Sequence, residues 1–223
     1  LFNQLIGMGK TLRMKKLLHA PFTLKKSLLD MIARETAFAA AGKPAHIMAK
    51  VNSLTDPKII RAFYKASQAG VQIRLCVRGT CCLRPGVPGL SDNIRVISVV
   101  GRFLEHARIL CFHNNGKPEY YLGSADLMQR NLERRVEVLA PIDDPRLQAE
   151  LRHFLDCQLN DQRGAWDMQP DGTYRRREPL RVHDGASRAN AWQRAIALLK
   201  SVRIASPETR VSQFPHEMSG GMR

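Results

Sequence analysis

The sequence predicts an α/β fold. Two short apolar runs, Ala45–Val51 and Val71–Arg78, have the length and composition of buried strands, and an amphipathic helical pattern lies between them. A strand, a helix and a second strand joined this tightly form a crossover unit, so the two strands should be parallel with the helix on one face of the sheet. Further along, Asn114–Lys117 is typical of a hairpin turn and is flanked by two more strand-like runs.

Three helices have recognisable ends. Leucines and an isoleucine at four-residue spacing predict a helix over Thr23–Ala41. An Asp-Pro pair supplies an N-cap and a proline at the first helical position, and it predicts helix starts at Asp56 and Asp144. Gly70 ends the second helix. The expected apolar stripe of the third consists of Leu147, Leu151, Phe154 and Leu155.

The remaining strands and one loop complete the main domain. Strand-like runs occur at Ile94–Val100, Ala107–His113, Glu119–Leu122 and Arg135–Ala140. The segment Leu83–Ser91 holds two prolines and two glycines and should be a loop. Open α/β sheets bind ligands beyond the carboxyl ends of their parallel strands, and this loop follows such a strand. We therefore expect it to border a ligand site.

Composition limits the possible functions. The chain has 223 residues, of which 44% are hydrophobic, so it can build a core. Lys and Arg exceed Asp and Glu by 35 − 20 = 15 charges, which predicts an anionic partner. The five cysteines lack zinc-ligand spacing and suit a reduced compartment. No apolar run is long enough to span a bilayer, so no transmembrane segment is expected.

The segment Gly101–Asn131 carries the residues suited to chemistry. His106 and Arg108 lie two apart on an expected strand, so their side chains should share one face, and the hairpin returns Ser124 close beside them. A histidine can exchange a proton or hold a phosphoryl group, an arginine binds phosphate oxygens, and a Gly-Ser turn offers N–H and hydroxyl donors. This combination predicts a phosphate pocket.

A single histidine at a strand end is more often structural than catalytic. The assignment of His106 to a functional site therefore depends on its companions Arg108 and Ser124. The other histidines of the main domain lack such companions and are left out of the site: His19, His46, His113 and His153.

Two resemblances rest on these residues. The pattern His106-x-Arg108 followed by Gly123-Ser124-Ala125-Asp126 resembles a half-site of the phospholipase D superfamily, with arginine in place of lysine. The longer segments Val51–Ile109 and Tyr121–Val138 resemble the carboxyl-terminal part of bacterial polyphosphate kinase. This second similarity extends from Leu1 to about Glu178.

The resemblance implies a phospholipase D-like mixed sheet flanked by helices and the reversible transfer of the terminal phosphate between ATP and polyphosphate, with Mg²⁺ accompanying ATP. In that family the phosphorylated histidine belongs to an upstream half, so the chain alone is expected to be inactive. Arg78 and His106 match family positions that contact nucleotide phosphates. His106 is the expected catalytic residue and assists transfer, while Arg78, His106, Arg108 and Ser124 bind ATP or phosphate. No residue is assigned to a metal.

The end of the chain does not continue this similarity. Leu180–Arg223 resembles the helical region and signature motif of an oligopeptide-type ATP-binding cassette ATPase, including its Ser219-Gly220-Gly221. We expect a main domain over residues 1–168, a polar linker over 169–187 and a short helical appendage over 188–223.

Two other functions remain open. One is a phospholipase D-like phosphodiesterase that acts as a dimer, and the other is a non-catalytic polyanion-binding module that uses Arg175–Arg177. The expected partners are ATP, ADP and polyphosphate, with a homo-oligomer and without specific nucleic acid. The expected location is the cytoplasm, and peripheral attachment to the inner membrane is left open.

Overall fold

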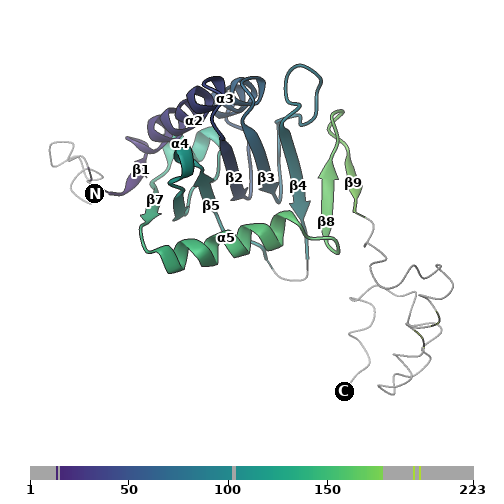
Figure 1. The fold of residues 1–223 in the computed structure, drawn as a ribbon. Helices are drawn as coiled ribbons and strands as arrows, with labels where there is room; N and C mark the ends of the chain where they lie inside the picture. The colour runs from purple at the N-terminus through teal and green to yellow at the C-terminus, as the bar shows by residue number, and fades with distance from the viewer. Residues whose placement is uncertain (1–13, 15, 102–103, 178–192, 194–195, 197–223) are drawn as a thin grey trace, which may run out of the picture. The chain divides into compact units, whose positions relative to one another are not determined.

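The computed structural model describes residues 14, 16–101, 104–177, 193 and 196. The chain divides into two compact units, Leu1–Glu178 and Pro179–Arg223, and the fold described here is that of the first. Figure 1 shows its elements in chain order. They are β1 (Leu18–Ala20), α2 (Leu24–Ala40), β2 (His46–Val51), α3 (Pro57–Gln68), β3 (Gln72–Val77), β4 (Ile94–Val99), β5 (Ile109–Phe112), η1 (Asn114–Gly116), β6 (Glu119–Gly123), α4 (Gln129–Arg134), β7 (Glu137–Ile142), α5 (Pro145–Leu159), β8 (Ala165–Met168) and β9 (Tyr174–Arg176).

The strands form one mixed sheet in the order β1-β7-β6-β5-β2-β3-β4-β8-β9. Strands β2, β3 and β4 are parallel neighbours at its centre. Strand β5 lies antiparallel to β2 and is joined to β6 by the short η1 turn. The α/β class, the mixed sheet and the predicted hairpin are confirmed.

The predicted crossover unit is present, with α3 connecting the parallel strands β2 and β3. The Asp56 carboxylate accepts hydrogen bonds from the backbone N–H groups of Lys58 and Ile59, at 2.9 and 3.0 Å, so it caps α3 as its sequence position indicates. Asp144 caps α5 in the same way through the N–H of Arg146, at 2.8 Å.

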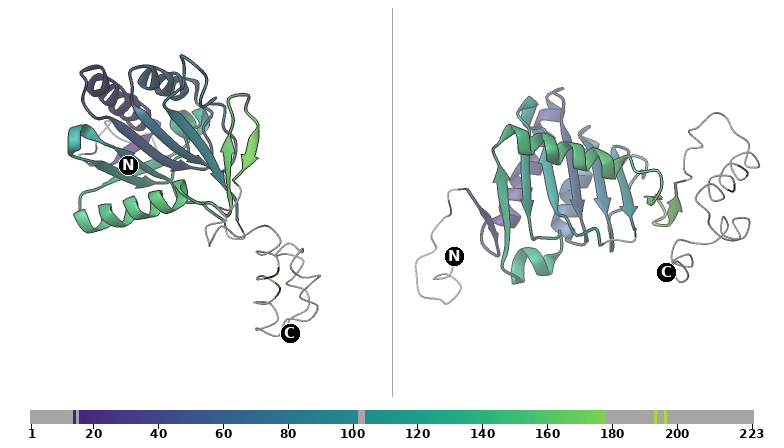
Figure 2. Two further views of the ribbon diagram at one scale, coloured as in Figure 1. Left: turned by 45° about the vertical axis from the view of Figure 1, so that its right-hand side comes forward. Right: turned by 90° about the horizontal axis from the view of Figure 1, so that it is seen from below.

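Helices cover both faces of the sheet. Helices α2 and α3 lie on one face and α5 crosses the other, which Figure 2 shows from two sides. The core under α2 and α3 includes Leu28, Phe63 and Leu75, and the smaller core under α5 includes Ile97 and Leu155. Leu147 of the predicted α5 stripe is instead 46% exposed, because it lies in the first turn, ahead of the buried part of the helix.

The sheet extends further than the sequence patterns indicate. Residues 165–176 form the hairpin β8–β9, and β8 pairs with β4, so the expected polar linker over 169–187 is wrong over its first part. Arg177 does not extend as an arm, because its guanidinium binds the Asp167 carboxylate twice at 2.8 Å and the Asp161 carbonyl at 2.9 Å. The rest of that linker and the similarity of the tail to a cassette ATPase lie outside the described residues.

The loop Leu83–Ser91 differs from its predicted role. It leaves the carboxyl end of β3 but returns along the sheet, and Gln68 at the end of α3 donates to the Gly89 carbonyl at 3.0 Å. Asn93 then pairs with Ser67, and its carbonyl accepts from the N–H of Ile73 near the start of β3. Since β3 and β4 are parallel neighbours, the connection must return to the amino ends of the strands, so most of this loop lies away from their carboxyl ends.

Within the described residues, no helix is both long enough and apolar enough to cross a membrane.

Candidate functional site

Four segments meet at the carboxyl ends of the central strands. The ends of β2 and β3 lead into Asn52 and Arg78. Because β5 runs antiparallel to β2, the chain entering β5, which holds His106 and Arg108, lies at the same edge of the sheet. The chain leaving β6 adds Asp126. The sheet topology therefore places most of the predicted site at one edge.

Arg108 is fixed by a buried carboxylate. Its Nη2 lies 3.0 Å from Asp126 Oδ2, and both side chains are at least 87% buried, at 13% and 9% exposure. Asp126 Oδ1 accepts from the backbone N–H groups of Asn52, at 2.7 Å, and Ser53, at 3.3 Å. Ion pairs excluded from water and supported by further hydrogen bonds hold a fixed geometry. Asp126 thus ties Arg108 to the end of β2.

His106 lies against the guanidinium of Arg108. Arg108 Nη1 is 3.3 Å from Nδ1 and Nη2 is 3.2 Å from Nε2, while Nη1 also donates to the His106 carbonyl at 3.2 Å. A neutral imidazole has a single acceptor nitrogen, so only one of the two ring contacts can be a hydrogen bond. His106 itself is exposed. The two side chains meet as predicted.

The sequence predicts that His106 and Arg108 share one face of a strand, and this reason for their contact is wrong. Strand β5 begins at Ile109, so His106 and Arg108 do not alternate along a strand. They lie in the irregular segment that precedes it, and Asp126 holds Arg108 there.

Arg78 lies at the same edge, two strands away from β5. It follows β3 directly beside Asn52, where Val51 is the partner of Val77, and its carbonyl accepts from the Ser98 hydroxyl at 2.9 Å. With neighbouring strands about 4.8 Å apart, Arg78 is on the order of 10 Å from the start of β5.

Ser124 is placed differently from the other three predicted residues. Its hydroxyl donates to Glu137 Oε2 and accepts from the N–H of Val138 at 3.2 Å, so it is engaged with β7. A Cβ at Gly123 would overlap the Val138 carbonyl, which explains the glycine by the close approach of β7. The assignment of Ser124 to phosphate stays a prediction without a supporting contact.

The sequence interpretation missed three residues of this edge. Asn52 is 5% exposed, and neither polar atom of its amide has a hydrogen-bond partner in the described part of the chain. Lys50 is fully buried with Nζ 3.6 Å from Glu105 Oε2, next to His106. A lysine inside an apolar strand, followed by an asparagine at the strand end, is the signal that could have found Lys50 and Asn52. Asp126 stood in the quoted pattern, but its role was not assigned.

The described residues do not offer a metal site. No group of three or more His, Cys, Asp and Glu side chains among them could hold a metal ion. Asp126, the carboxylate closest to Arg108, is already bound by one guanidinium and two backbone N–H groups.

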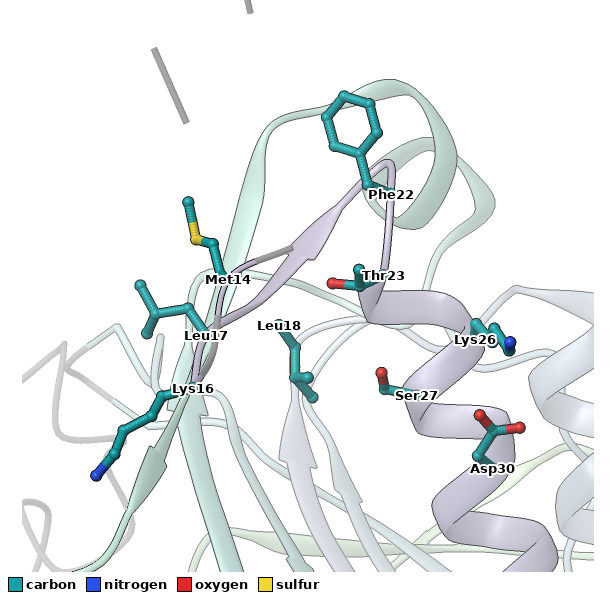
Figure 3. Close-up of a pocket in the computed structure, with 9 residues that line it drawn as sticks. All are labelled: Met14, Lys16, Leu17, Leu18, Phe22, Thr23, Lys26, Ser27 and Asp30. Atoms are coloured by element: carbon teal, nitrogen blue, oxygen red, sulfur yellow. The ribbon is translucent and has the colours of Figure 1, made fainter. Parts of the chain in front are cut away.

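Two cavities lie elsewhere, and neither is lined by Arg78 or His106. One, of about 330 Å³, lies between β1 and the first turns of α2 and is shown in Figure 3. Its Lys16 is paired with Asp143 at 2.7 Å. The other, of about 540 Å³, lies under α5 near the start of β2.

Comparisons with known proteins identify the family of this chain. The family model "Polyphosphate kinase C-terminal domain 2" matches residues 17–188. The chain is 65% identical over 179 residues to the polyphosphate kinase of Pseudomonas aeruginosa, covering 80% of this chain and 26% of that protein. It is 58% identical over 179 residues to the enzyme of Thermosynechococcus vestitus, covering 80% and 24%. The chain thus spans about a quarter of the length of these curated relatives.

Solved structures show the same fold. The crystal structure of polyphosphate kinase from Porphyromonas gingivalis matches 93% of this chain and 31% of its own, with a TM-score of 0.77 and 36% identity. Nuc from Salmonella typhimurium, a phospholipase D family member, matches 69% of this chain and 97% of its own, with a TM-score of 0.50 and 13% identity, a likeness of fold alone. The family model and these relatives together show that the chain belongs to the family of polyphosphate kinase C-terminal domains.

Proposed function

We propose that this chain provides the part of a polyphosphate kinase that binds the phosphates of ATP during reversible transfer of the terminal phosphate to polyphosphate. The observation that carries the proposal is the connected set His106–Arg108–Asp126, which is anchored on the backbone N–H groups at the end of β2. It presents an exposed imidazole on a buried ion pair at the edge where open α/β sheets bind ligands.

The residues at this edge suit phosphoryl transfer. Reactions between two highly charged anions are accelerated by cations whose positions are fixed before the reaction begins. Arg78 provides a positive charge at the end of β3, where its backbone carbonyl accepts from the Ser98 hydroxyl. Its guanidinium would bind phosphate oxygens in a bidentate manner.

His106 would exchange a proton with the phosphate. Whichever ring nitrogen accepts from Arg108, the other can carry the proton, and the ring is exposed. Imidazole is suited to proton exchange near neutral pH. Arg108 would then orient His106 and add positive charge beside the phosphates.

The buried Asn52 is a further candidate contact. Its amide has unused hydrogen-bonding capacity within the described structure and lies next to Arg78 in the register of β2 and β3. A buried amide without a partner is costly, so a bound phosphate would provide the missing acceptor.

The remaining expectations belong to the same proposal. We infer that Mg²⁺ enters as the Mg·ATP substrate complex, which the similarity to polyphosphate kinases supports. The partners would be ADP and polyphosphate as well as ATP, the protein would form homo-oligomers, and it would work in the cytoplasm. The similarity to polyphosphate kinases supports these points.

The test is calorimetric titration of Mg·ATP into the whole chain and into the variants Arg78→Gln and His106→Asn. Loss of one charge-assisted hydrogen bond should weaken ATP binding about tenfold in each variant. Arg146→Gln at the start of α5 and His153→Asn in the middle of α5 remove exposed side chains of the same types away from this edge and serve as matched controls. Unchanged affinity in both site variants would exclude the proposed pocket. Cleavage of a phosphodiester by the wild-type chain would favour the phosphodiesterase alternative.

A further inference from the structure

The cavity under α5 lies at the opposite end of the sheet from the nucleotide site. His46 and Gln72 are the first residues of β2 and β3 and are register partners, and both line the cavity. The chain beyond β5 brings His113 to the same place through a 3.0 Å hydrogen bond from its N–H to the His46 carbonyl. Six residues of extended strand separate His46 from Asn52, which corresponds to roughly 20 Å.

The strand register gives this cavity a set of cationic side chains. Arg74 is the register partner of Met48, which also faces Cys111 across β5, and all three line the cavity. Arg152 of α5 also lines it. The lining therefore includes two guanidinium groups and two imidazoles, and no carboxylate lines it.

Both guanidinium groups are held in place and keep unused donors. Arg74 uses only Nη2 on described partners, donating to Asn160 Oδ1 at 2.8 Å and to the Leu159 carbonyl at 3.4 Å. Arg152 uses Nε on Asp156 Oδ2 at 2.7 Å and also interacts with the Tyr120 hydroxyl. An arginine fixed along one edge presents its remaining N–H groups in a defined direction, which favours binding of an oxyanion.

The two imidazoles face a cavity whose lining holds no carboxylate. Their ring centroids are 5.2 Å apart in an edge-to-face arrangement, and Nδ1 of His113 is buried without a partner among the described residues. Burial lowers the pKa of His46, and the positive charges of His113 and Arg152 lower it further.

The neighbouring ionisable groups place no carboxylate in the cavity itself. The groups around the two rings are Glu35 of α2, Arg74 of β3, Cys111 of β5, Tyr120 of β6, and Arg152 and Asp156 of α5. Burial raises the pKa of Cys111 to about 11 and that of Tyr120 to about 12, so both are neutral near pH 7. Asp156 is bound to Arg152. Glu35 of α2 interacts electrostatically with His113, but its carboxylate accepts from the N–H of Asn114 at 2.7 Å and does not line the cavity.

We infer that this cavity binds a phosphate-type oxyanion, either free orthophosphate or one phosphate group of a polyphosphate chain, held by Arg74, Arg152 and the imidazoles of His46 and His113. The planar guanidinium groups match phosphate geometry, and both imidazoles can donate to its oxygens. The site is independent of the nucleotide pocket, since the two share no residue.

The test uses NMR of the whole chain, with the imidazole Cε1–H signals of His46 and His113 as local probes. Tripolyphosphate should shift both signals and raise the pKa of His46, since a bound anion stabilises the protonated ring. Orthophosphate and polyphosphate of defined length are titrated separately. A response to orthophosphate assigns the site to the free ion, and a response restricted to tripolyphosphate and longer chains assigns it to polyphosphate.

Variants separate this site from the nucleotide pocket. The double variant Arg74→Gln/Arg152→Gln should weaken the response at least about tenfold, because two charge-assisted contacts are lost. Arg146→Gln, an exposed arginine in the first turn of α5 outside the lining, is the matched control. Arg78→Gln should leave the two signals responsive, so a failed nucleotide pocket would not be mistaken for a failed cavity.

Two results would overturn the inference. One is that the two signals do not move with any of the three anions. The other is an equal response in the folded double variant. If the double variant does not fold, His46→Asn replaces it, since His46 is exposed, and the His113 signal is followed instead.

Discussion

Asp126 is the residue on which the geometry of the candidate site depends most. It accepts two backbone N–H groups at the end of β2 and also binds Arg108, which lies against His106. A buried carboxylate in this position determines where the guanidinium lies, and through it where the imidazole lies. The position of His106 therefore depends on the buried carboxylate of Asp126, acting through Arg108.

Replacing Asp126 by Asn should destabilise the domain and loosen His106. The buried guanidinium of Arg108 would lose its counter-charge, which typically costs about 3 kcal/mol. Urea unfolding measures the loss, with Asp30→Asn, an exposed aspartate of α2, as the control. Equal stability of the two variants would show that the ion pair does not anchor the site.

Glu35 should make stability depend on pH. Its side chain is fully buried, burial raises its pKa above 4.5, and its contact to the N–H of Asn114 at 2.7 Å only partly opposes that shift. A carboxyl group with a raised folded-state pKa binds its proton more tightly in the folded state. Its contribution is therefore fully present below pH 4.5 and is lost as pH rises through the folded-state pKa.

The variant Glu35→Gln cannot ionise, so its free energy of unfolding should decline less between pH 4.5 and neutrality than that of the wild type. Chemical denaturation at a series of pH values measures both curves. Parallel curves would refute the assignment.

For single residues, the sequence predicted the candidate phosphate-binding side chains but not the residues that hold them in place. His106, Arg108 and Arg78 lie at one edge of the sheet, as expected. The roles of Asp126, Asn52 and Lys50 depend on contacts between residues about 50 to 75 positions apart, such as Asn52 with Asp126, and local patterns do not report such contacts.

The two Asp-Pro helix starts are the same sequence signal, but they contribute differently to the stability of the folded domain. Asp56 is fully buried, caps α3 and binds Lys25 Nζ at 2.6 Å, and Lys25 in turn pairs with Glu133 of α4. Asp144 is exposed and caps α5 through a single N–H. Asp56 thus links α3 to α2 and, through Lys25, to α4, whereas Asp144 contacts only its own helix α5.

Asp144→Ala should therefore cost about 1 kcal/mol, the usual value for a lost N-cap. Asp56→Ala should cost about 3 kcal/mol or more, because it also leaves the largely buried Lys25 with one carboxylate fewer. The midpoints of urea unfolding compare the two variants directly. Equal costs would mean that the Lys25 pair adds no stability.

Element prediction succeeded where the pattern was long and failed where it was short. The helices α2, α3 and α5 and the strands β2 to β7 were expected close to their observed bounds. The missed elements are β1, α4, β8 and β9, none longer than six residues. Strands of three or four residues acquire their conformation from pairing, as β8 does with β4, rather than from their own composition.

For the whole molecule, the observed end of the main domain differs from the expected one. The sequence interpretation ended that domain at 168, whereas the first compact unit extends to Glu178 and includes β9. Within the hairpin, Ala165 and Met168 are buried, and Arg177 fastens the last residues to Asp167. We propose Glu178 as the end of the main domain.

Truncation tests this boundary. A chain ending at Glu178 should keep the thermal midpoint of the main domain nearly unchanged, because the hairpin contacts remain. A chain ending at Gly164 loses β8 and β9 and exposes β4, so its midpoint should fall by more than about 5 °C. A large fall in the first truncation would show that the residues beyond 178 belong to the same folding unit.

We propose that ATP phosphates bind at the carboxyl ends of β2 and β3. The most direct test is a backbone amide NMR titration of the whole chain with Mg·ATP. We predict that the shifted signals concentrate at Asn52, Ser53, Arg78, Gly79 and His106–Arg108. The claim would be contradicted if these signals stayed in place while others moved, for instance those near the start of β2 and β3.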